Sequence, residues 1–132
     1  TDTRIEVDAV LADGPTNDNF GVICRFQDDK NFYGLVLSHD GYYGIFKFQD
    51  GRMTMASDDG NMGFSEAIRQ SGVVNHIQAT CQENVLSLSA NDVLLAEVVD
   101  DSFQSGKIGL ITGAYNEPGV VVFFDNFKVF QP

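Results

Sequence analysis

Two carboxylates with a spacing that could serve chemistry lie near the start of the chain, at Glu6 and Asp8. They alternate with Val7 and Ala9, so an extended strand would point both acids to one face. Retaining glycoside hydrolysis needs two carboxyl groups about 5–5.5 Å apart, one as nucleophile and one as acid and base. Glu6 and Asp8 alone lack that acid/base partner, and the chain has no Trp to hold a sugar. The other interpretation is a solvated edge of an early strand, and we assign no catalytic residue.

The two histidines do not complete a reactive group either. Ser38, His39 and Asp40 are the residue types of a hydrolytic triad, but a triad is assembled in space and not from adjacent residues. His76 is predicted on the outward face of a strand. Two cysteines cannot form a closed zinc site. We therefore expect that the chain is not an enzyme.

The charge balance excludes one class of partner. The net charge is −11, with 19 acidic and 8 basic residues, and such a field repels phosphate backbones. No nucleic acid is expected. The acids are scattered through turns, which favours a solubilising surface. The alternative is a structural Ca²⁺ site among turn carboxylates, since Ca²⁺ takes about 6–8 oxygen ligands. No cofactor is assigned with certainty.

The length and the apolar runs bound the organisation of the chain. The 132 residues are expected to form a single domain over 1–132, long enough to bury a core. No apolar run approaches the ~18 residues of a membrane helix, so no membrane span is expected. No leader pattern is visible, which predicts a mature or trimmed chain.

The two cysteines, Cys24 and Cys81, both fall on strand faces that look directed to a core. Alternation places Cys24 with Phe20, Val22 and Phe26. A disulfide between the two sulfurs would close about 57 residues and contribute on the order of 4 kcal/mol. The alternative is two buried free thiols, which behave as small hydrophobic side chains. Export from the cell would favour the disulfide.

The alternation of apolar residues predicts β-strands throughout. Strands are expected over residues 3–11, 20–27, 31–39, 42–49, 73–81, 85–90, 93–99, 107–112 and 120–130. The turn at Asp40-Gly41 is strong, because this pair tolerates the positive φ angles of a short hairpin. Residues 51–71 are the least regular segment, with one helical turn expected at 65–70. About nine short strands with turns between them indicate an all-β, two-sheet antiparallel sandwich.

The last strand breaks its own alternation. Val122 and Phe124 keep a period of two, but Phe127 and Val129 continue out of phase. A β-bulge at Asp125-Asn126, where one extra residue resets the register, explains the break. Asp125 would then either cap the amide groups of the bulge or act as a structural Ca²⁺ ligand.

The strands over 31–39 and 42–49 carry aromatic residues on both faces. One face must be core, and the other carries Phe32, Tyr42 and Phe46. We expect those rings to be covered by more chain or offered to a ligand. Gly34 and Gly44 would leave shallow hollows between the rings, as a flat ligand requires.

Arg25 is the charge of most interest in this part of the chain. Alternation places it mid-strand on the face of Ile23, beside the aromatic face. A guanidinium fork there could hold a ligand hydroxyl or carboxylate. The alternative is an ion pair with a nearby acid. The ligand-binding residues predicted from the sequence are therefore Arg25, Phe32, Tyr42 and Phe46.

Several segments together resemble a known family. They are Phe20-Gly-Val-Ile-Cys-Arg25, Asn31-Phe-Tyr33, Asp40-Gly-Tyr-Tyr-Gly-Ile45, Gly106-Lys-Ile-Gly-Leu110 and Phe124-Asp-Asn-Phe-Lys-Val129. The chain resembles the concanavalin A-like, laminin-G-like jelly rolls of bacterial surface proteins and of domains beside glycoside hydrolases. It also resembles the 3-keto-disaccharide hydrolase domain. The segment Glu6 to Leu11 looks close to the strand motif of laminarinase-type glycosidases, with Leu11 where the final acid would stand.

The resemblance implies a fold more firmly than a function. Such domains usually begin with a further strand or hairpin, and its absence here would leave a sheet edge or an apolar face uncovered. Uncovered edges recruit other strands, so either the chain is trimmed, or a homo-oligomer or a donated strand fills the place. The implied function is non-catalytic recognition of carbohydrate or a cell surface, in an extracellular or cell-surface location. The alternatives are a structural module of an extracellular assembly and, third, a glycosidase-like enzyme.

Overall fold

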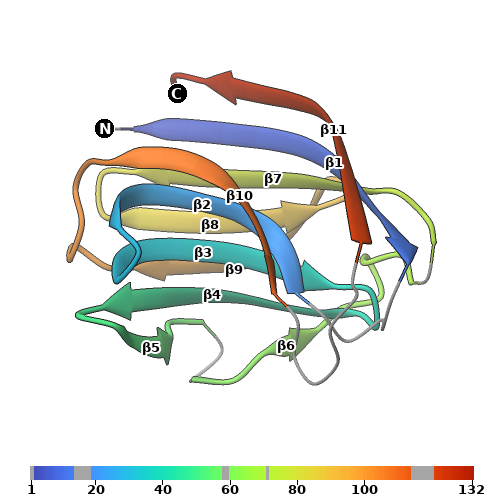
Figure 1. The fold of residues 1–132 in the computed structure, drawn as a ribbon, viewed down its shortest axis with the longest axis horizontal. Helices are drawn as coiled ribbons and strands as arrows, with labels where there is room; N and C mark the ends of the chain where they lie inside the picture. Colours follow the sequence, from blue (N-terminus) through green and yellow to red (C-terminus); the bar gives the residue numbers. More distant parts are fainter. Residues whose placement is uncertain (1, 14–18, 58–59, 71, 114–120) are drawn as a thin grey trace.

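The computed structural model in Figure 1 describes residues 2–13, 19–57, 60–70, 72–113 and 121–132. Within these ranges the chain is built of β-strands and contains no α-helix. No helix long and apolar enough to cross a membrane occurs in the described ranges. The prediction of an all-β, two-sheet antiparallel sandwich is confirmed.

One layer, here called sheet A, contains five strands. Their order is β11 (Val121–Phe130), β1 (Thr3–Asp13), β7 (Asn75–Gln82), β8 (Val85–Ala90) and β9 (Val93–Val99). Every neighbouring pair is antiparallel. The first and last strands of the chain therefore lie side by side, with β11 at one edge of the sheet (Figure 1).

The second layer, sheet B, contains the predicted three-strand meander. Its order is β10 (Lys107–Gly113), β2 (Asn19–Asp28), β3 (Asn31–Ser38), β4 (Tyr42–Gln49) and β5 (Arg52–Met55), and the short β6 (Gly63–Phe64) also pairs with β4. The pairing of β3 with β4 places Phe32 opposite Phe48 and Gly34 opposite Phe46. The two tight turns of the meander thus fix which side chains become neighbours across the sheet.

The main core fills the space between the two layers. It combines the inward residues of sheet A, such as Ile5 and Leu88, with those of sheet B, such as Phe20 and Leu35, all fully buried. Cys24 on β2 and Cys81 on β7 form a disulfide across this core. The disulfide, which the sequence left open against two free thiols, is therefore present and joins the two sheets.

A bulge in β2 overturns two predicted side-chain directions. Arg25 has a φ of 53°, and the pairings of β2 shift register on both sides of it. Because the bulge adds one residue, Cys24 stays in the main core while Phe26 joins the aromatic cluster on the outer face with Ile23. The prediction that Phe26 shares the face of Cys24 is wrong, and so is the placing of Arg25 beside the aromatic face.

The segment predicted as irregular, residues 51–71, is partly strand. Arg52–Met55 pairs with β4 as β5, and Gly63–Phe64 pairs with the start of β4 as β6. The helical turn expected at residues 65–70 is instead a single hydrogen-bonded turn, in which the amide of Ile68 donates to the carbonyl of Ser65 at 3.3 Å. The backbone groups at the free edge of β4 are available for pairing, which explains why these two short segments become strands.

The predicted bulge in the last strand is present, one residue further along. Glu6 lies opposite Lys128 and Asp8 opposite Asp125, so Asn126 and Phe127 together face the single residue Val7. Asn126 has a φ of 55°, a left-handed value that Asn tolerates better than most residues. The bulge resets the alternation, as the sequence indicated.

Candidate functional site on the outer face of sheet B

The outer face of sheet B, which points away from sheet A, carries a second apolar cluster. Its buried members are Phe32, Val36 and Phe46, surrounded by partly buried side chains. The ring centroids of Phe32 and Phe46 lie 6.3 Å apart in an edge-to-face arrangement, and those of Phe32 and Phe48 lie 5.0 Å apart and stacked. The sequence correctly separated these residues from the main core, because strict alternation along β3 and β4 divides the two sets.

The glycines of this face are covered by the chain itself. A Cβ atom at Gly34 would lie 2.2 Å from the ring of Phe46, and one at Gly44 would lie 2.8 Å from the Sδ of Met55. The ring and the thioether therefore lie where side chains would otherwise stand. The prediction of open hollows at Gly34 and Gly44 is wrong, because Phe46 and Met55 fill them.

A groove of about 750 Å³ remains above this cluster. Its apolar wall contains aromatic, thioether and aliphatic side chains, namely Phe46, Phe48, Met53, Met55, Met62 and Ile111. The methionines and Ile111 were not predicted to belong to a site. The period-two spacing of Met53 and Met55 was the available signal, because it places both on one face of a strand.

One end of the groove is polar and is formed by Asn19, Ser38, Asp40 and Tyr42. The Ser38 hydroxyl donates to the Asp40 carboxylate and accepts from the backbone amide of Tyr42. Tyr42 is 43% exposed, and the centroid of its ring is 5.4 Å from that of Phe64. A hydroxyl, an amide and a carboxylate thus lie next to an accessible ring, which is a set of groups able to bind a polyhydroxylated ligand.

His39 takes no part in this end of the groove. Its ring stacks on Phe20 with centroids 4.0 Å apart, and only 1% of the residue is exposed. Burial lowers the pKa of His39 to about 4. Ser38 bonds to Asp40 and not to His39, so the three adjacent residues do not form a triad.

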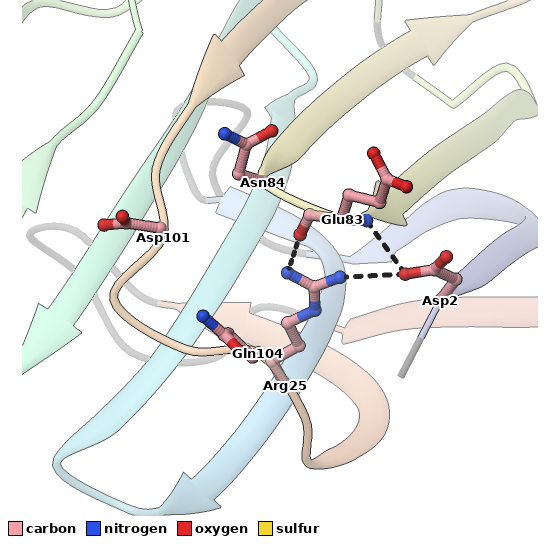
Figure 2. Close-up of a pocket in the computed structure, with 6 residues that line it drawn as sticks. All are labelled: Asp2, Arg25, Glu83, Asn84, Asp101 and Gln104. Carbon is pink, nitrogen blue, oxygen red and sulfur yellow. Dashed lines mark hydrogen bonds and ion pairs between the residues drawn. The ribbon is translucent and has the colours of Figure 1, made fainter.

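Arg25 lies elsewhere, next to Asp2 and Glu83, as Figure 2 shows. Its guanidinium donates to the backbone carbonyls of Glu83 and Phe103 and lies 3.3 Å from the carboxylate of Asp2. The residue is 2% exposed, so it acts as a tie between the layers. A polar pocket of about 540 Å³ adjoins it, lined also by Asn84, Asp101 and Gln104. The structure therefore separates Arg25 from Phe32, Tyr42 and Phe46.

A second group of polar contacts, around Asp100, lies in the neighbouring part of the sandwich. The Tyr33 hydroxyl donates to Asp100 at 2.5 Å, and the Lys47 ammonium bonds the same carboxylate at 2.9 Å. Burial would raise the pKa of Asp100, but the hydrogen bonds from Tyr33 and Lys47 outweigh it and lower that pKa to about 2. Burial, with the Asp100 contact, raises the pKa of Tyr33 to about 12. These groups are mutually satisfied and hold the loop after β9.

The two carboxylates near the chain start lie on the outer face of sheet A. Glu6 accepts from Nε2 of His76 at 2.9 Å, and Asp8 accepts from Nδ1 of the same ring at 2.7 Å. Asn126 donates to the second oxygen of Asp8 at 2.8 Å. His76 faces outward as predicted, but its partners come from β1, about 70 residues away in sequence. The groove and the carboxylates thus lie on opposite faces of the sandwich.

Asp125 caps its own bulge. One of its carboxylate oxygens accepts from the backbone amide of Asn126 at 2.7 Å, which is the capping role that the sequence left open against Ca²⁺ ligation. Within the described ranges, no group of three or more His, Cys, Asp or Glu side chains is arranged to hold a metal ion. Ca²⁺ binding at Asp125 stays a prediction.

Comparison with known proteins places this geometry in a fold class. No protein-family model and no curated protein matches the sequence. The structure is similar to the carbohydrate-binding module CBM66 from Bacillus subtilis, with a TM-score of 0.74 and 17% identity over 97% of this chain and 74% of that one. It is also similar to sheep galectin-11 in complex with glycerol, with a TM-score of 0.70 and 15% identity over 98% of this chain and 90% of that one.

A third similarity is to part of a longer protein. The GH43 protein BlXynB from Bacillus licheniformis matches with a TM-score of 0.70 and 11% identity, over 98% of this chain and 27% of that one. The chain therefore has the two-sheet fold of the concanavalin-like β-sandwiches, as its sequence segments indicated. At these identities the likeness establishes the fold alone.

Proposed function

We propose that this chain is a non-catalytic binding module that takes a carbohydrate in the groove on the outer face of sheet B. The observation that carries the proposal is the exposed ring of Tyr42 next to Ser38 and Asp40, at the polar end of an otherwise apolar groove. Carbohydrate-binding modules and galectins are among the proteins with this fold, which supports the same conclusion.

Each part of the groove has a role in this proposal. The Tyr42 ring stacks on the apolar face of a sugar, and the groups of Asn19 and Asp40 bond its hydroxyls. Phe46 forms part of the floor, and Phe32 supports it from the side. Because the remaining wall is thioether and aliphatic, the groove favours sugars that present C–H faces over highly charged ones. The ligand role predicted for Arg25 stays a prediction, tied to a different pocket.

The proposed location is outside the cell or at its surface. The disulfide between Cys24 and Cys81 supports this, because disulfides form and persist in oxidising compartments. The non-catalytic part of the proposal is supported by the position of Glu6 and Asp8, which are bonded to His76 on the far face of the sandwich.

A glycan array followed by calorimetry tests the proposal. We expect at least one neutral glycan to bind, and the substitution Tyr42→Ala to weaken it about tenfold, the change that corresponds to about 1.4 kcal/mol. The matched control is Val99→Ala on β9, which removes an exposed side chain from the other sheet and should leave affinity unchanged. Absence of binding to every sugar at millimolar concentration would overturn the proposal, as would equal effects of the two variants.

A second candidate, a structural module of an extracellular assembly, is favoured by one observation. Phe32 and Phe46 are only 7% and 6% exposed, so two of the three predicted rings are covered by the chain itself. In this candidate the groove is filled by protein and not by sugar. The same array separates the two candidates, because a structural module binds no glycan. For such a module, Tyr42→Ala disrupts its assembly instead.

A further inference from the structure

Strand β11 forms an edge of sheet A with a long apolar surface. In the sheet order it pairs with β1 alone, so the backbone groups on its other side have no strand partner in the described ranges. Its exposed apolar residues are Phe123, Phe127, Val129 and Phe130. An exposed apolar edge strand of ten residues is a template for pairing with another strand.

The pairing with β1 tells which side chains of β11 point outward. Phe130 lies opposite Arg4, whose guanidinium is 4.4 Å from the centre of the Phe130 ring. Lys128, Asp125 and Phe123 lie opposite the outward positions Glu6, Asp8 and Val10. The outward face of β11 therefore reads aromatic, acidic, basic, aromatic along the chain. On the inward face, Phe124 and Val129 lie opposite the core residues Ala9 and Ile5.

This outward pattern is complementary to itself. If a second copy of β11 lies antiparallel, with the two-fold axis between Asn126 and Phe127, then Phe123 lies opposite the partner's Phe130. In the same register Asp125 lies opposite the partner's Lys128, and Phe124 lies opposite the partner's Val129. Aromatic pairs and opposite charges are the cross-strand pairs that stabilise antiparallel sheets. The bulge falls on the axis, so the two regular arms on either side form the pairing.

Other registers lose these contacts. A shift of the pairing between the two β11 strands by one residue sets outward side chains opposite inward ones, which the pleat does not allow. A shift by two sets Asp125 opposite either the partner's Asn126 or the partner's Phe130. Only the register given above places aromatic residues opposite each other and also places opposite charges across from each other.

The charges of sheet A supply an independent reason for a second copy. Asp125 lies opposite Asp8 on β1, but the cation next to this pair, His76, bonds Asp8 and not Asp125. Neither Asp125 nor Lys128 takes part in an ion pair within the described chain. A second copy brings a cation to each Asp125. The opposite edge, β9, also exposes Val93, Leu94 and Val99, but its only charged residue is Glu97, so it has no charge pattern of this kind.

We propose that β11 pairs antiparallel with β11 of a second copy of this chain, so that the two A sheets become continuous in a homodimer. The dimer leaves the groove of sheet B free on each copy. It is therefore independent of what that groove binds.

Sedimentation velocity over a range of concentrations tests the proposal. We expect the unaltered chain to dimerise, and Lys128→Asp to weaken the dimer by roughly tenfold or more, because two attractive cross-strand pairs become repulsive. Asp125→Lys should do the same. Mixing the two variants should restore dimers, since one chain then supplies only acids and the other only bases at these positions. The control is Val99→Lys on β9, which should not change the dimer.

Three results would overturn the proposal. They are a monomer at every concentration, mixed variants that remain monomeric although each is folded by circular dichroism, and a dimer lost in Val99→Lys but kept in Lys128→Asp. Hydrogen exchange of the unaltered chain gives a second measurement that needs no variant. Amides of β11 should gain protection with rising concentration, whereas amides of β9 should not, and the reverse pattern also contradicts the proposal.

Discussion

The outer faces of the two sheets differ, although both cover the same core. The outer face of sheet B is a cluster of rings and thioethers around Phe46, with a groove above it. The outer face of sheet A carries Glu6, Asp8 and His76 in a chain of ionic and hydrogen-bonded contacts. The central strands of sheet B are apolar on both sides, whereas β1 and β7 of sheet A carry polar groups on their outer side.

The burial of two strands shows what this difference means. Along β7 buried and partly exposed residues alternate, the pattern of a strand with one side in water. Along β3, seven of the eight residues are buried in an unbroken run. Antiparallel sheets commonly leave one face solvated. An apolar second face in such a sheet is therefore a place where an outside ligand or partner is expected, which is why the proposed binding groove is on sheet B.

The largest expected effect comes from His39, the residue that directly follows β3. His39 is buried without a hydrogen-bond partner on Nε2 in the described structure, and its pKa falls from 6.5 to about 4. A lowered pKa means that the unfolded chain takes up a proton first, so stability is full above pH 6.5 and is lost as pH falls toward 4. The loss is about 3 kcal/mol. His39→Phe keeps the stack on Phe20 and should flatten this part of the urea-unfolding stability curve.

Comparing the unaltered chain with His39→Phe removes the contribution of other acid-sensitive groups to the loss of stability. The difference between the unaltered chain and His39→Phe isolates the histidine, because carboxylates contribute equally to both. If both proteins lose stability with the same slope between pH 6.5 and 4, the assignment of a neutral, buried His39 is wrong.

A medium effect is expected on the outer face of sheet B. Gly34→Ala places a methyl group 2.2 Å from the Phe46 ring, so the ring must move and the cluster around it must adjust. We expect a loss of about 1–3 kcal/mol in the free energy of unfolding. The control is Gly109→Ala on β10 of the same sheet, where an added Cβ meets nothing within 4 Å. Equal stability of the two variants would show that Phe46 is not packed on Gly34.

The smallest effect is expected on the outer face of sheet A. Hydrogen bonds and charge from Asp8 and Glu6 raise the pKa of His76, and hydrogen bonds from Asn126 and His76 lower the pKa of Asp8. A raised histidine pKa means that this contribution is complete below pH 6.5 and is lost as pH rises through the raised value. Arg4, Lys128 and Asp125 lie around the same group.

His76→Gln measures this contribution. Because the site is partly exposed, we expect a loss below about 1 kcal/mol at pH 6, vanishing at alkaline pH. The direction is opposite to that for His39, so the two histidines distinguish the faces by the sign of their pH dependence. A loss that is the same at pH 6 and pH 9 would mean that packing, and not charge, holds His76.

Much of the architecture followed from local pattern. The turn at Asp40-Gly41, the alternation in β3, β4 and β8, and the phase break in the last strand all lie within a few residues of one another, so they could be read along the chain. The disulfide of Cys24 and Cys81 was one of two open interpretations. The short β5 and β6 were not predicted, because their pairing depends on the free edge of β4 and the spacing of Met53 and Met55 is too short a pattern to predict a strand by itself.

The candidate site followed from the sequence only in part. Phe32, Tyr42 and Phe46 were placed on the correct face, but the covering of Gly34 by Phe46 depends on side-chain packing between strands. Arg25 was misplaced because the apolar residues of β2 keep a period of two through its bulge, whereas the bulge of β11 breaks the alternation. Glu6 and Asp8 were paired as neighbours, but the ring that joins them comes from β7.

The sequence by itself determined that this protein is a two-layer β-sandwich, because alternation and turn chemistry act over a few residues. The tertiary structure decided which rings stay exposed, where Arg25 points and what His76 contacts. The physical reason is the period of two in a strand. One inserted residue reverses every later side chain, and only contacts between distant segments fix where that insertion occurs.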